Sequence, residues 1–158
     1  MYDNYNESTR QMIAAFCMGM RVDTATITIP HTATTIYYHI HGGKILLTNL
    51  VGEIVVAADG ANSVHIDHTP TTGSASVIAA AADIDTWLIG DIITLNGLYS
   101  DVIFPVVAAG KSSSMAYKGI VLTPGSLSWH SNGTTAGDWK WSLFYVPLDD
   151  GAYVEAIV

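Results

Sequence analysis

The fold is decided by the C-terminal stretch Gly119–Val158, which reads Gly-Ile-Val-Leu-Thr-Pro-Gly-Ser-Leu-Ser-Trp-His-Ser-Asn-Gly-Thr-Thr-Ala-Gly-Asp-Trp-Lys-Trp-Ser-Leu-Phe-Tyr-Val-Pro-Leu-Asp-Asp-Gly-Ala-Tyr-Val-Glu-Ala-Ile-Val. Apolar segments of strand length alternate here with turn-forming residues. Three of the four tryptophans, Trp129, Trp139 and Trp141, lie in it, and each indole buries a large apolar area. We predict the central hairpin of an all-β domain, with residues 131–137 as the loop between the Trp-bearing strands.

The same pattern of short apolar segments and turns extends upstream to residue 24. The predicted segments are 24–29, 34–41, 44–51, 53–58, 62–69, 75–81, 84–90, 91–95, 101–109 and 116–122. Turn signals stand at Gly42-Gly43 and Asp59-Gly60, Gly52 breaks a segment, and Pro105 makes its segment an edge strand or the site of a bulge. About a dozen short strands indicate an antiparallel β-sandwich or barrel, jelly-roll-like in character.

The first 22 residues differ from the rest and are predicted to form an N-terminal arm before a single β-rich domain at 23–158. Apolar side chains fall at helical spacing from Met12 to Met20, and they are Met12, Ile13, Phe16, Cys17 and Met20. Two roles stay open: a local plug for the domain's own core, and an element that docks on a neighbouring subunit. Cys17 is the only cysteine, so the chain forms no internal disulfide, and its apolar neighbours indicate a buried, unreactive thiol.

The composition excludes several function classes. Of the 158 residues, 49% are hydrophobic and only 13% charged, about half the usual charged share, which predicts contact with other subunits. Fourteen acids against six bases give a net charge of −8, so neither nucleic acid nor an anionic membrane is an expected partner. The acidic N-terminus and the short apolar runs predict a chain made and folded in a cytoplasm.

The histidines offer the sharpest candidate for chemistry. His39 and His41 are two apart on a predicted strand, so both imidazoles point to one face, as a metal site would need. In a homotrimer such a strand near the three-fold axis would offer six nitrogens. His65 and Asp67 would share a face of another strand while His68 points away. Ordinary surface or hydrogen-bonded histidines are the favoured interpretation, and no metal or cofactor is expected.

Other motifs are weaker. Asp83-Ile-Asp85 resembles the Asp-x-Asp of sugar-nucleotide transferases, but no nucleotide-binding βαβ unit surrounds it. Asp149-Asp150-Gly151 is better explained as a turn than as a calcium loop, because further oxygen ligands are missing. With no nucleophile elbow and no Cys/His pairing, we predict that the protein is not an enzyme.

The aromatic side chains of the opening stretch leave two interpretations open. The rings of Trp129, Trp139, Trp141, Tyr145 and Tyr153 could together form a sugar-stacking platform. The favoured alternative is that the tryptophans fill the core or a subunit interface.

Several stretches resemble the structural virion proteins of tailed bacteriophages. They are 40–54, 66–73, 91–97, 124–141 and 145–154, and they span most of the chain after residue 35. The resemblance implies a β-rich surface or connecting part of a phage particle and transfers no site residues. Our expectation is a capsid decoration (cement) protein of the virion that binds the major capsid protein and itself, as a homotrimer. The alternatives are a tail or head-fibre component and a glycan-binding adhesion module.

Overall fold

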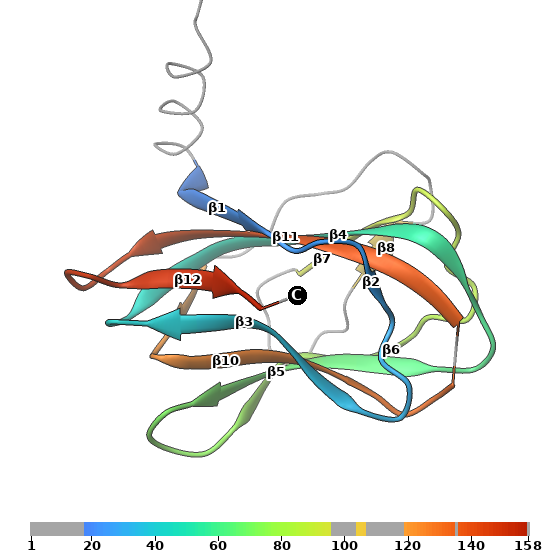
Figure 1. Ribbon diagram of the computed structural model, residues 1–158, viewed down its shortest axis with the longest axis horizontal. Coiled ribbons are helices and arrows are strands. Elements are labelled where there is room, and N and C mark those ends of the chain that lie inside the picture. Colours follow the sequence, from blue (N-terminus) through green and yellow to red (C-terminus); the bar gives the residue numbers. More distant parts are fainter. Residues whose placement is uncertain (1–17, 96–103, 107–118, 135, 158) are drawn as a thin grey trace, which may run out of the picture.

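The protein is a β-sandwich in which two antiparallel sheets pack face to face (Figure 1). The computed structural model describes residues 18–95, 104–106, 119–134 and 136–157. These residues contain twelve strands, and the predicted all-β class is confirmed in its sandwich form. Met12, Ile13, Phe16 and Cys17, which carry the predicted docking arm, lie outside the described residues.

The first sheet has seven strands and is built around the longest of them, β4 (Ile45–Asp59). Its strand order is β1 (Met20–Asp23), β11 (Ala136–Pro147), β4, β7 (Ile92–Thr94) and β8 (Phe104–Val106), while β2 (Ile27–Thr28) pairs with β11 and β9 (Ile120–Leu122) pairs with β4. β8 is the last strand in this order, so Pro105 lies on a terminal strand, as predicted. A proline fits there because it has no backbone N–H to donate to a further strand. Residues 20–22, assigned to the arm from sequence, belong to the sheet.

The second sheet has five strands. Its order is β12 (Tyr153–Ala156), β3 (Thr34–His41), β10 (Gly125–Ser131), β5 (Ser63–Pro70) and β6 (Ser76–Asp83). The alanine run at 79–82 is part of β6, so its intrinsic preference for helix is overridden by pairing with β5.

The prediction that the two Trp-bearing strands pair with each other in a hairpin is wrong. β10 and β11 follow one another in the chain, but β10 pairs with β3 and β5, whereas β11 pairs with β4, β1 and β2. The chain between Ser131 and Ala136 therefore leads from one sheet to the other. Gly42-Gly43 and Asp59-Gly60 also connect strands of opposite sheets, whereas the turn at 71–75 closes a true hairpin between β5 and β6.

The prediction that Gly52 breaks a strand is wrong. β4 runs without interruption through it for 15 residues and pairs with β11 along most of its length. The register of this ladder shifts at three places, which lets so long a strand bend around the core.

The core lies between the sheets and is dominated by aromatic rings. Along β11 every second side chain is buried from Trp139 through Trp141 and Leu143 to Tyr145, as the period of two requires. Trp129 on β10 faces Trp141 across the sandwich, with ring centroids 5.0 Å apart. Such edge-to-face and stacked ring pairs add to the stability that burial alone provides.

Candidate functional site

The three tryptophans are interior residues of the single chain. Trp129 and Trp139 are 0% exposed and Trp141 is 1% exposed. Tyr145 is also buried, which leaves Tyr153 as the one exposed ring of the five proposed for sugar stacking. The open choice between core and interface is therefore answered by their position between the two sheets, and the five rings form no surface platform.

The three buried indole N–H groups have different surroundings. Trp139 donates its Nε1–H to the hydroxyl of Tyr37 at 2.7 Å, and both groups are buried. The indole nitrogens of Trp129 and Trp141 have no hydrogen-bond partner. Both rings instead take part in an edge-to-face cluster, in which an N–H at a ring edge can meet the π face of a neighbour.

Four histidines gather on the outward face of the five-stranded sheet. His39 and His41 come from β3, His65 from β5 and His130 from β10, while the neighbouring residues in each strand point to the core. Sequence reasoning paired His39 with His41 correctly, but His130 was missed because only the β10–β5 register brings it opposite His65.

The histidine face, as we call these four residues, divides into two pairs. The His39 and His41 rings are 5.7 Å apart, and His41 stacks on Tyr153 of β12 at 4.8 Å. His41 Nε2 lies 3.3 Å from a carboxylate oxygen of Glu155, within ion-pair distance but without hydrogen-bond geometry. A hollow of about 290 Å³ lies beside this pair, lined also by Thr69 and Ser126.

The second pair is held by neighbouring polar groups. The His65 and His130 rings are 4.6 Å apart. His65 Nε2 is 3.2 Å from a carboxylate oxygen of Asp67, and His130 Nδ1 is 2.6 Å from the hydroxyl of Thr34. His68 points the other way, is 6% exposed, and bonds through Nε2 to the Thr123 carbonyl at 3.0 Å, which confirms the predicted separation of His68 from His65 and Asp67.

The four imidazoles of the histidine face lie in two separate pairs and not around one point. Among the described residues, no three His, Cys, Asp or Glu side chains converge as a metal site requires. The face therefore brings four imidazoles together beside the carboxylates of Asp67 and Glu155.

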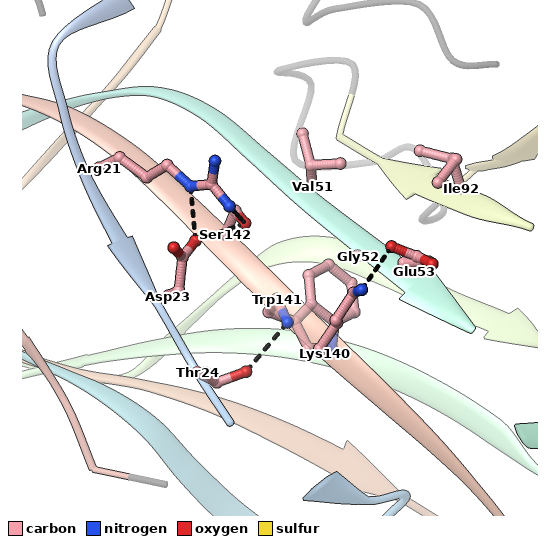
Figure 2. Close-up of a pocket in the computed structure, with 10 residues that line it drawn as sticks. All are labelled: Arg21, Asp23, Thr24, Val51, Gly52, Glu53, Ile92, Lys140, Trp141 and Ser142. Atoms are coloured by element: carbon pink, nitrogen blue, oxygen red, sulfur yellow. Dashed lines mark hydrogen bonds and ion pairs between the residues drawn. The ribbon is translucent and has the colours of Figure 1, made fainter. Parts of the chain in front are cut away.

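A second polar hollow, of about 350 Å³, lies on the outward face of the seven-stranded sheet (Figure 2). Arg21 bonds Asp23 at 2.6 Å, Ser142 donates to the same carboxylate oxygen at 2.6 Å, and Lys140 pairs with Glu53 at 2.9 Å. Burial raises the pKa of Asp23, but hydrogen bonds from Ser142 and Arg21 outweigh burial and leave it below its usual value. Because each cation already has its anion, the hollow offers no unbalanced charge to select a ligand.

The remaining acidic motifs have local structural roles. Asp83 accepts a hydrogen bond from the backbone N–H of Asp85 at 3.2 Å, which shapes the turn after β6. Asp149 accepts the Lys44 backbone N–H at 2.8 Å, and its carboxylate also lies 3.6 Å from Lys44 Nζ. Both motifs are accounted for by these turns.

The loop between β6 and β7 was not predicted from the sequence. Its tip places Leu88 and Ile89 in solvent, each 65% exposed, while Trp87 is buried beneath it. From the sequence, residues 84–90 are predicted to form an apolar strand. A usable signal was present, because a Leu-Ile pair stands between Asp85 and the Gly90-Asp91 turn.

The comparisons with known proteins add no assignment. A scan against protein-family models and searches of curated proteins and of solved structures found no match to this chain. In the parts of the chain that the structure describes, no helix has the length and apolar character that a membrane span requires.

Proposed function

We propose that this chain is a structural component of a bacteriophage particle, and specifically a capsid decoration protein on the outside of the head. The observation that carries the proposal is that large apolar side chains are exposed on several faces of a densely packed sandwich. They are Met18, Met20, Ile36, Val56, Val77, Leu88, Ile89, Val121, Val146, Leu148, Tyr153 and Ile157. Exposed apolar side chains mark sites where proteins meet other proteins when they adjoin one another.

The exposed side chains lie on different parts of the fold. Val121 and Val146 flank Leu46 in one cross-strand row on the seven-stranded sheet, where they are 55% and 38% exposed. Met20 is half-exposed on the terminal strand β1, and Val77 is exposed on β6, the edge of the other sheet. A subunit in a lattice contacts several neighbours at once, and this distribution fits that requirement.

The stability of the scaffold fits a static role. The core is filled by stacked and edge-to-face rings, with Tyr37 on Trp129 at 4.3 Å and Trp139 against Trp141 at 5.4 Å. A rigid part that binds the assembled shell and not its disrupted state stabilises the shell by mass action. The resemblance to phage virion proteins supports a place in the particle, and our proposal puts the chain on the head, with the major capsid protein and further copies of this chain, as a homotrimer, as partners.

The test is the copy number of the chain in purified particles, relative to the major capsid protein, by quantitative mass spectrometry. A ratio near one supports decoration, and particles assembled without the chain should then lose their contents at a lower temperature. A handful of copies per particle indicates a tail or fibre component instead. Absence from particles, or an unchanged thermal stability of shells that lack the chain, overturns the cementing role.

A further inference from the structure

The loop that joins β6 to β7 presents the most exposed large apolar side chains of the described chain. Leu88 and Ile89 are each 65% exposed, which exceeds the exposure of every other large hydrophobic residue described. The loop is anchored on both sides of the tip by Ile84, which is 0% exposed, and Asp91, which is 7% exposed. The exposed pair therefore projects from a fixed base.

Hydrogen bonds hold the tip in one conformation. The Asp91 N–H donates to the Leu88 carbonyl at 3.0 Å, and the Leu88 N–H donates back to the Asp91 carboxylate at 2.8 Å. Gly90 has φ of 85°, which the third position of a type II turn requires. Ile54 of β4 bonds Gly90 and Asp91 at 2.9 and 3.0 Å, so the turn extends the sheet. A tip ordered before binding loses little conformational entropy when it meets a partner.

Among the described residues, the two charged side chains that precede the tip in the chain are both acidic. Asp83 and Asp85 are exposed and immediately precede the tip in the chain. Every Lys and Arg among the described residues is paired with an acid outside this loop, as Arg21–Asp23, Lys44–Asp149 and Lys140–Glu53. The apolar tip is therefore flanked by carboxylates that no cation of the described chain neutralises.

We propose that the Leu88–Ile89 turn is a docking knob that inserts into an apolar socket of another protein, with Lys or Arg side chains on the socket rim. Apolar insertion supplies the binding energy, and the basic rim complements Asp83 and Asp85. A second copy of this chain is a poor occupant of this particular contact, because each described Lys and Arg is already paired with an acid of its own chain. The inference rests on the proposed function in one respect: the partner is taken to be a neighbouring protein of the particle.

The test is site-specific photo-crosslinking in the cells that naturally produce the chain. The probe is p-benzoylphenylalanine at position 89, and the matched control carries it at Thr72, which is exposed in another tight turn. We expect one discrete adduct from position 89, none from position 72, and an attachment site with Lys or Arg beside apolar residues.

Adding Leu88→Ser should lower the adduct yield about tenfold, because one buried leucine side chain is removed from the contact. Reversing both flanking charges, Asp83→Lys with Asp85→Lys, should lower it as well.

The outcomes separate the two proposals. Thermal melting of each variant checks folding. It should not change for Leu88→Ser, because that side chain is exposed, and it should fall only slightly for the charge reversal, which removes the exposed bond from the Asp85 N–H to Asp83. No adduct at position 89, equal adducts at both positions, an acidic attachment site, or attachment to a second copy each overturns the docking knob. A chain abundant in particles that gives no adduct overturns only the knob. An adduct on a basic-rimmed protein that is absent from particles overturns only the virion role.

Discussion

Gly52 lies directly opposite Trp141 in the β4–β11 ladder, and the indole occupies the space that a side chain at position 52 would need. A Cβ atom on Gly52 would approach three indole carbons to 3.0 Å. Trp141 cannot easily retreat, because the rings of Trp129 and Trp139 pack against it at 5.0 and 5.4 Å. A glycine inside a long strand is thus explained by the packing of one aromatic ring.

Replacement of Gly52 by alanine should destabilise the protein by about 1–3 kcal/mol, the usual range for overpacking a core. In a strand without this contact the same change would stabilise by about 0.5–1 kcal/mol, since alanine has less backbone freedom to lose. The sign of the change in unfolding free energy, measured in urea, therefore shows whether the Trp141 ring excludes a side chain at position 52. In a Trp141→Phe background the penalty should shrink, and a penalty that is unchanged there would argue against the ring contact.

Replacement of Tyr37 by phenylalanine should cost about 1–3 kcal/mol of unfolding free energy, because it leaves the buried Trp139 N–H without an acceptor. The matched control is Tyr38→Phe, whose hydroxyl makes only a long 3.4 Å bond to the Val22 carbonyl. Both rings are fully buried, so the two variants differ mainly in the bond that is lost. Equal losses of unfolding free energy in the two variants would show that the Trp139–Tyr37 hydrogen bond contributes no more to stability than the Tyr38 bond does.

Asn62 is predicted to clamp the connection between the two sheets. Its buried carbonyl oxygen accepts from the Ser131 hydroxyl at 2.7 Å and from the Gly133 N–H at 3.0 Å. Asn62→Ala should therefore cost about 1–3 kcal/mol. Asn132→Ala removes a single exposed bond to the Ser63 N–H and should cost less than about 1 kcal/mol. Thermal melts of the two variants measured side by side make the comparison, and a reversed order would contradict the clamp.

His68 should make the stability fall in mildly acidic solution. Burial lowers the pKa of His68, and this effect outweighs the hydrogen bond to Thr123, which raises it. The unfolded chain therefore binds a proton at His68 more readily than the folded chain does. The stability contributed by neutral His68 is fully present above the pKa of the unfolded chain. It is lost as the pH falls from that value through the lower pKa of the folded chain.

The measurement for His68 is the unfolding free energy between pH 7.5 and pH 5, in the wild type and in His68→Gln. Glutamine keeps a donor for the Thr123 carbonyl but does not titrate, so the variant should lose less stability as the pH falls. Comparison of the two proteins removes every contribution to the pH dependence that they share. Parallel curves would show that His68 does not cause the pH dependence.

The strand content and the direction of many side chains could be predicted from local pattern. Trp139 and Trp141 had to share a face, and His68 had to oppose His65, because side chains alternate along any strand. Pro105 marked a terminal strand because it lacks a backbone donor. Each of these conclusions depends on the geometry of one strand and needs no knowledge of its neighbours.

The pairing of the strands was decided only by the tertiary structure. A turn at Asp59-Gly60 or at 132–135 reverses the chain equally well within a sheet or between two sheets, and only burial of both inner faces selects the crossing. His130 joins His65 through that pairing, and Gly52 is tolerated in β4 because Trp141 lies opposite. The exposure of Leu88 and Ile89 likewise depends on contacts with Ile54, which is distant in sequence. Alternation along a strand is local and can be read from the sequence, whereas partner choice depends on packing of the whole chain.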